Sequence, residues 1–144
     1  MPAGEVHERA NLLFGEGAAL AGSALGLDWR EPLWLGAALG YALGTFWVTP
    51  DLDNFPRYPV LAARRWGPLK LVWLPYGLLF RHRGLAHHWV LGPLSRLLYL
   101  SPLLLPLRGW LEGLEPALLW GSLAGYYASQ WLHLALDGIP LRRL

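Results

Sequence analysis

The sequence predicts an all-α protein: a helical bundle with four long apolar helices that span a membrane and a short interfacial helix. Hydrophobic residues make up 54% of the 144 positions and charged residues only 15%, against about 25% in ordinary globular domains. Four apolar stretches approach the roughly 20 residues that a spanning helix needs. Lys and Arg are distributed unevenly between the segments that join these stretches.

Length and composition limit what the chain can contain. A chain of 144 residues is one domain's length, so we expect residues 1–144 to form a single helical membrane domain with one site. The absence of cysteine excludes disulfides, thiolate zinc sites and cysteine nucleophiles. The first residues include Glu5, Glu8 and Arg9, so no cleavable signal peptide is expected.

The first two apolar stretches are residues 10–27 and 32–50. The first carries one charged side chain, Glu16, and the second carries none. Small residues recur at every fourth position of the second stretch, which leaves one helix face without side chains and lets another backbone approach closely. These residues are Gly36, Gly40 and Gly44.

Residues 67–80 form a shorter apolar segment that contains Lys70 and Pro75. Its 14 residues are too few to cross a bilayer, so we predict an interfacial or re-entrant helix on the cytoplasmic side. Residues 88–107 supply the third long helix, and beyond their first residue they carry only Arg96 as a charged side chain.

Residues 116–136 supply the fourth long helix. They contain a single histidine, His133, and no Asp, Glu, Lys or Arg. Small residues again recur at every fourth position, as Gly121, Gly125 and Ser129. We expect such faces to pack helices closely and to allow a homo-oligomer to form.

The charge distribution predicts an orientation in the membrane. If all four stretches span, both termini and the segment 51–83 share one side, which carries nine Lys and Arg against two on the opposite side. The positive-inside rule then predicts a multi-pass protein of the inner (cytoplasmic) membrane, in contact with membrane lipids and with both termini in the cytoplasm. The alternative, that all four stretches are buried helices of a soluble all-α domain, stays open.

Histidines and aspartates gather at the predicted cytoplasmic ends of these helices. His133 and Asp137 are four residues apart, so both project from one helix face. Asp51 and Asp53 lie between prolines in a rigid turn, where they can meet cations or serve as a turn or helix cap. Mixed His and Asp ligands are typical of Zn, Mn or Fe. The predicted metal ligands are His7, Asp51, Asp53, His82, His87, His133 and Asp137.

The segment 81–88 supplies imidazoles at the start of the third long helix. Gly84 allows the backbone to bend close to an ion. His88 would point about 100° away from His87 on a helix, so we expect it to support the site or to lie on the surface. Arg81 and Arg83 can clamp phosphate oxygens, or they can interact with anionic lipid headgroups.

Four motifs along nearly the whole chain carry a resemblance to known families. They are Met1-Pro2-Ala3-Gly4 with His7, Thr49-Pro50-Asp51-Leu52-Asp53, His82-Arg83-Gly84 with His87, and His133 with Asp137. The chain resembles a bacterial family of metal-binding proteins of unknown function. It is also similar to inner-membrane metal-dependent hydrolases described as LexA-binding. A more distant resemblance is to the zinc-dependent phospholipase C and P1 nuclease group, which implies clustered His and Asp ligands in an all-α protein.

We therefore expect a metal-dependent hydrolase with a mono- or dinuclear site at the cytoplasmic membrane face. Seven candidate ligands exceed what one tetrahedral ion uses, which favours two ions, zinc before Mn or Fe, and the hydrolysis of a small-molecule or lipid phosphoester. The alternative is a non-catalytic metal-binding membrane protein with a structural, sensing or transport role. The basic loop has no nucleic-acid-binding motif, so a nucleic-acid partner is not expected.

Overall fold

The computed structural model describes residues 4–80 and 84–140, and every regular element within these ranges is helical. The all-α prediction is therefore confirmed. The longer helices are α1 (Gly4–Ala24), α2 (Pro32–Phe46), α5 (Leu91–Leu104) and α7 (Pro116–Leu136). The shorter elements are η1 (Pro50–Asn54), α3 (Leu61–Arg65), η2 (Gly67–Val72), α4 (Trp73–Leu79), η3 (Leu85–His87), η4 (Leu105–Leu107) and α6 (Arg108–Glu112).

Prolines set where the apolar helices begin and end. Pro32 and Pro116 occupy the first positions of α2 and α7, where the fixed φ of proline suits a helix start and its missing N–H costs nothing. Pro50 begins the separate element η1, so α2 has only 15 residues. Pro102 lies inside α5, which has 14 residues and then continues as the tighter helix η4. Two of the four predicted spans are thus shorter than the sequence suggested.

The prediction of four membrane-spanning helices is not supported. Within residues 4–80 and 84–140, no helix combines the length and the hydropathy that crossing a bilayer requires. The helices α1 and α7 have 21 residues each, but α1 includes Glu5, Glu8 and Asn11, and α7 includes Gln130 and His133. This finding contradicts the predicted multi-pass localisation in the inner membrane, and the orientation with both termini in the cytoplasm loses its basis.

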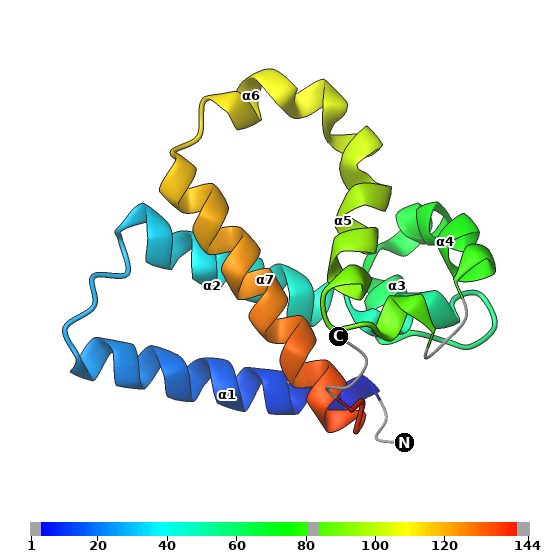
Figure 1. Ribbon diagram of the computed structural model, residues 1–144, viewed down its shortest axis with the longest axis horizontal. Helices are drawn as coiled ribbons and strands as arrows, with labels where there is room; N and C mark the ends of the chain where they lie inside the picture. The colour runs from blue at the N-terminus through cyan, green and yellow to red at the C-terminus, as the bar shows by residue number, and fades with distance from the viewer. Residues whose placement is uncertain (1–3, 81–83, 141–144) are drawn as a thin grey trace.

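The two glycine-containing faces pack against each other within one chain. Helices α2 and α7 cross at the middle of the structure, with α7 running diagonally in front of α2 in Figure 1. A Cβ atom added at Gly40 would lie 1.8 Å from the carbonyl oxygen of Ser122, and one added at Gly125 would lie 1.9 Å from that of Ala37. The backbones therefore approach too closely for any side chain at these positions. The expected homo-oligomer stays a prediction.

The segment predicted as interfacial contributes two aromatic side chains to the protein core. Trp73 and Tyr76 of α4 are fully buried and stack edge to face with ring centroids 5.6 Å apart. They pack in a cluster that includes Val48, Leu52 and Tyr126. Lys70 and Pro75 lie within η2 and α4 at exposed positions, and leucines of both elements are exposed as well, so the segment is buried on one face only.

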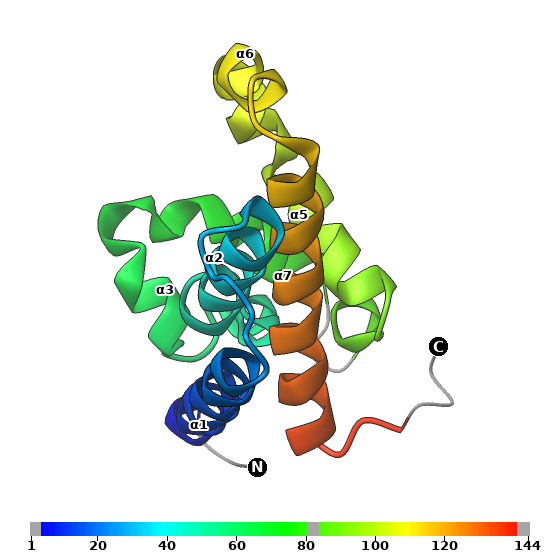
Figure 2. The same ribbon diagram turned by 90° about the vertical axis from the view of Figure 1, so that its left-hand side faces the viewer.

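The remaining helices determine the outline of the molecule and the place of the site. From α5 the chain passes through η4 and α6 as an arch that projects from the other helices before it returns into α7 (Figures 1 and 2). At the opposite end of α7, its last turn meets the first turns of α1 (Figure 1). The elements η1 and η3 lie against the same end of α7.

Candidate metal centre

Five of the predicted ligands come together at the end of α7. They reach this point from four separate parts of the chain, each held by its own helical element. His7 lies at the end of the first turn of α1, His133 in the last turn of α7, and Asp137 caps the same helix. Asp51 comes from η1, whose start is set by Pro50, and His87 ends η3. We refer to these residues as the His/Asp cluster: His7, Asp51, His87, His133 and Asp137.

Distances within the His/Asp cluster match those between ligands of one metal ion. Asp137 lies at the centre: its Oδ1 is 3.4 Å from His7 Nε2, and its Oδ2 is 3.6 Å from both His87 Nε2 and His133 Nε2. The distance from His133 Nε2 to Asp51 Oδ1 is also 3.6 Å. Tetrahedral coordination with bonds of about 2.0–2.1 Å places neighbouring ligand atoms about 3.3 Å apart. The cluster is therefore spaced for coordination.

Hydrogen bonding among the described residues leaves several of these atoms unsatisfied. Both ring nitrogens of His7, Nε2 of His133 and both carboxylate oxygens of Asp137 are buried and have no hydrogen-bond partner within residues 4–80 and 84–140. Buried polar groups without a partner cost about 1–3 kcal/mol each, and more when charged. A cation bound by Nε2 of His7, Nε2 of His133 and the Asp137 carboxylate would satisfy these atoms apart from His7 Nδ1, so the residues fit a metal ion.

The cluster divides into two groups that each suit one ion. His7, Asp51 and His133 form the first group, and Asp51, His87 and Asp137 form the second. Within each group the ligand atoms lie within 4.8 Å of one another. Asp51 belongs to both groups, and a carboxylate has two oxygens with which it can bridge neighbouring ions.

The electrostatic environment favours the ligand forms of most of these residues. Burial, followed by repulsion from His133, lowers the pKa of His7, so this imidazole is neutral at neutral pH. Burial raises the pKa of Asp51, but contact with His133 outweighs it and holds the pKa below its ordinary value. Burial raises the pKa of Asp137, but contact with His87 and the nearby His133 and His7 together outweigh burial and lower it. Metal ions bind neutral imidazoles and ionised carboxylates.

Asp53 contacts the His/Asp cluster through His87, at the ring nitrogen that does not face Asp137. Its Oδ2 lies 3.2 Å from Nδ1 of His87, and both side chains are completely buried. This contact holds the imidazole with Nε2 directed at Asp137, as carboxylates commonly do for metal-bound histidines. Burial lowers the pKa of His87, yet its contacts with Asp137 and Asp53 outweigh burial and raise the pKa. Asp53 itself belongs to neither group of metal ligands.

A buried arginine fixes the segment that carries His87. Arg96 of α5 is fully buried and donates hydrogen bonds of 2.9 Å to the carbonyl of Ala86 and to Oε1 of Gln130. Gln130 in turn donates to the carbonyls of Gly44 and Val48 at the end of α2. The network joins α2, α5, α7 and η3 beside the cluster. Sequence analysis noted Arg96 only as the lone charge in an apolar helix, which was the available signal.

A salt bridge ties α1 to the rest of the structure at the edge of the cluster. Arg65 of α3 donates two hydrogen bonds, of 2.6 and 2.7 Å, to the two carboxylate oxygens of Glu8. Because Glu8 follows His7, this bidentate pair holds the histidine-bearing turn of α1 in place. Sequence analysis did not find this pair, since the two residues are distant in the chain.

Other predicted site residues have different positions. Arg81, His82 and Arg83 lie outside the described residues. His88 accepts hydrogen bonds at Nδ1 from the backbone N–H groups of Val90 and Leu91, 3.2 and 3.1 Å away. It therefore caps the start of α5.

Comparisons with known proteins agree with a metal centre. The family described as "Uncharacterized metal-binding protein (DUF2227)" matches residues 2–114, and the chain belongs to this family. The match includes His7, Asp51, Asp53 and His87, whereas His133 and Asp137 lie after its end. The predicted resemblance to a metal-binding family is confirmed; these comparisons do not show the relation to LexA-binding hydrolases.

A relative from Aquifex aeolicus (strain VF5), described as "Uncharacterized protein", is 42% identical over 73 residues. The match covers 51% of this chain and 47% of the relative, so the chain spans about half the length of that protein. No solved structure matches the chain.

Proposed function

We propose that this member of a metal-binding family holds two divalent cations in the His/Asp cluster and hydrolyses a phosphoester there. The observation that carries the proposal is the position of Asp51 in both ligand groups. A shared carboxylate brings two ions close together, and paired ions about 3.5–4 Å apart are typical of phosphatases and nucleases. Imidazole and carboxylate ligands favour zinc, with manganese or iron as alternatives.

Bound ions at this position would act as Lewis acids toward a phosphoryl oxygen and lower the pKa of a water molecule. The protein's own residues supply the rest of the site. Asp53 orients His87, and burial of the imidazoles, whose side chains are 0–4% exposed, excludes bulk water.

The cluster is reached from the side of Asp51. The Asp51 side chain is 19% exposed, more than any other member of the His/Asp cluster. A small pocket of about 20 Å³ lies beside His7, Asp51 and His133, enough for about one water molecule. Thr49 and Arg65 also line this pocket. Its position supports an open coordination site on the solvent side, which a hydrolase needs.

The deep burial of the three imidazoles favours a second candidate, a non-catalytic metal centre. A structural site fills its coordination with protein ligands, whereas a catalytic site keeps one position open. The two candidates differ in what they predict for substrate: only the hydrolase turns over a phosphoester.

The experiment measures metal content and activity on the same protein. Elemental analysis of the purified chain should find two divalent ions per molecule. After removal by chelator, Zn, Mn, Fe or Mg is restored separately, and release of p-nitrophenol is followed from p-nitrophenyl phosphate and bis(p-nitrophenyl) phosphate. Activity should return with at least one of these ions.

Two variants distinguish a predicted metal ligand from a histidine that lies outside the His/Asp cluster. Asp51→Asn should lose one ion and lower the rate by at least about a hundredfold, because changes at groups outside the metal's own ligands already cost about 10–100-fold. His88→Ala, which leaves the cluster intact, serves as the matched control and should retain both ions. Two tightly bound ions without cleavage of either ester would reject the hydrolase in favour of the non-catalytic centre.

A further inference from the structure

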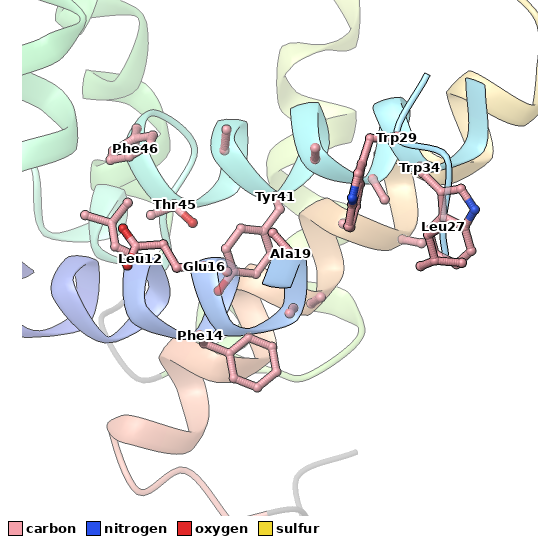
Figure 3. A pocket seen from close by; sticks show the side chains of 18 residues that line it. Leu12, Phe14, Glu16, Ala19, Leu27, Trp29, Trp34, Tyr41, Thr45 and Phe46 are labelled. Carbon is pink, nitrogen blue, oxygen red and sulfur yellow. The ribbon is translucent and has the colours of Figure 1, made fainter. Parts of the chain in front are cut away.

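A large apolar cavity lies beside the His/Asp cluster. It has a volume of about 600 Å³ and lies between α1, α2 and α7 (Figure 3). This volume is in the range of pockets that bind small molecules, about 300–1,000 Å³. Its walls are formed mainly by carbon atoms of apolar side chains, among them Leu12, Phe14, Ala38, Ala124 and Ala128.

The cavity is elongated and has two different ends. Along α2 its lining extends from Trp34 to Phe46, about 18 Å of helix. Trp29 and Trp34 form the far end, with their rings edge to face and 6.4 Å apart. Figure 3 shows Tyr41 near the middle of the cavity and Thr45 toward the other end, both reaching from α2 toward α1. A straight apolar chain fits this shape better than a compact ligand.

The polar end of the cavity adjoins the metal centre. Thr45 lines both the apolar cavity and the small pocket beside His7, Asp51 and His133. The hydroxyl of Tyr41, a residue that lines the cavity, donates to Asn11, a residue that lines the small pocket, with an oxygen-to-oxygen distance of 2.8 Å to its carbonyl. The two spaces therefore meet at Thr45, and the hydrogen bond between Tyr41 and Asn11 joins a residue of one lining to a residue of the other.

An unpartnered hydroxyl points to a ligand at this junction. Thr45 is only 4% exposed, and its Oγ1 has no hydrogen-bond partner within the described parts of the chain. A buried hydroxyl without a partner is costly, and a polar group of a ligand at the junction would satisfy it. Burial raises the pKa of Tyr41 to about 12, so its hydroxyl stays protonated as a donor. Glu16, the acidic residue of the lining, is exposed and therefore solvated.

We propose that the cavity binds the apolar chain of a single-chain amphiphile whose phosphoester head lies at the metal centre. The inference rests on the proposed function, which it deepens by naming the substrate class. The head binds the cations of the His/Asp cluster, and the chain extends past Thr45 and Tyr41 toward the two tryptophans. A molecule that carries both chemical features can contact both spaces, which meet at Thr45.

The test uses butylphosphonate and octylphosphonate, which cannot be hydrolysed and which differ in chain length. Their dissociation constants for the zinc-loaded protein are measured by isothermal titration calorimetry. Each added methylene should strengthen binding by up to about fourfold if it is buried, so we expect octylphosphonate to bind at least about tenfold more tightly. Equal affinities for the two compounds would overturn the inference.

Two tryptophan variants on α1 locate the chain. Ala19→Trp fills the cavity, because Ala19 lines it, and should bring the octylphosphonate affinity close to that of butylphosphonate. Ala21→Trp, at an exposed position of the same helix outside the lining, should leave both affinities unchanged. Circular dichroism checks that both variants keep their helices. Equal effects of the two variants would place the chain elsewhere and contradict the inference.

Metal removal tests where the head lies. In the metal-free protein both phosphonates should bind more weakly by a similar factor, while the ratio of their affinities persists. Unchanged affinity without metal would contradict the placement of the head. These results can be told apart from a failure of the proposed function. Hydrolysis and metal content test the metal centre, whereas the ratio of the octylphosphonate and butylphosphonate affinities tests the cavity.

Discussion

Helix α7 makes two close contacts with the rest of the chain, and different forces stabilise them. Its first half packs on α2 through Gly121 and Gly125, backbone against backbone. Its last turn packs on α1, η1 and η3 through His133 and Asp137, which approach other titratable groups at 3.4–3.6 Å. The first contact needs nothing besides the protein, because dispersion attraction requires only that the surfaces of the two helices lie close together. The second brings together buried imidazoles and carboxylates, several of whose atoms have no hydrogen-bond partner among the described residues, and a cation there would satisfy most of them.

The comparison explains how one helix can serve both purposes. A tight glycine contact leaves α7 little freedom to shift or rotate, so the side chains at its end are held where they converge. The same rigidity would not be obtained from the cluster alone, because its buried carboxylates and imidazoles lose favourable contacts when the ion is absent. Changes in the two regions should therefore have separable effects on folding and on metal binding.

The largest effect is expected in the glycine contact. Gly40→Ala places a Cβ 1.8 Å from the carbonyl oxygen of Ser122, so the helices must separate, and the free energy of unfolding should fall by about 3 kcal/mol. The matched control is Gly17→Ala in α1, where a Cβ meets no atom within 4 Å. That variant should gain up to about 1 kcal/mol from helix propensity. Urea denaturation followed by circular dichroism measures both, and equal behaviour would contradict the close packing.

The next largest effect is expected at the last turn of α7, on the stability that a bound metal ion adds to the protein. Zinc at about a hundred times its dissociation constant should stabilise the wild-type protein by about 2.7 kcal/mol. Asp137→Asn should remove most of this increment, since Asp137 contacts three imidazoles of the cluster. Thermal unfolding with zinc and with chelator gives the increment. A zinc increment in Asp137→Asn equal to that of the wild type would exclude Asp137 as a ligand.

A smaller effect is expected from the support behind the cluster. Asp53→Asn weakens the contact with Nδ1 of His87, and metal affinity should fall by about 10–100-fold without loss of an ion. His88→Ala should leave metal affinity unchanged and cost about 1 kcal/mol of stability through the lost cap of α5. Competition with a chromogenic chelator measures the affinities. If His88→Ala weakened metal binding more than Asp53→Asn, the assigned roles would be reversed.

The smallest effect is expected at the edge of the site. Arg65 and Glu8 form a bidentate pair whose side chains are 29% and 17% exposed, so solvent screens the interaction. A double-mutant cycle with Arg65→Gln and Glu8→Gln should give a coupling energy of about 1 kcal/mol. The coupling should decrease in high salt. A coupling energy of zero at low salt would show that the pair does not hold α1.

The amino-acid sequence determined the helical class and most of the site. Periodic glycines in residues 36–44 and 121–125 indicated where two helices approach closely, and the structure pairs these segments. The spacing of His133 and Asp137 placed both on one helix face, and the structure brings both into the cluster. These features depend on helical periodicity, which neighbouring residues along the chain are sufficient to define.

Tertiary structure alone decided which partners those residues meet. Asp51 and Asp53 are equivalent by sequence, yet one joins both ligand groups and the other lies behind His87. The apolar stretches also fall short of membrane-spanning helices, because prolines shorten some of them and polar residues lower the hydropathy of others. Arg96 stands out in the sequence as a lone charge in an apolar stretch, but nothing there identifies Gln130, 34 positions away, as its hydrogen-bond partner. Such contacts depend on how the helices cross, and local periodicity does not encode the geometry of that crossing.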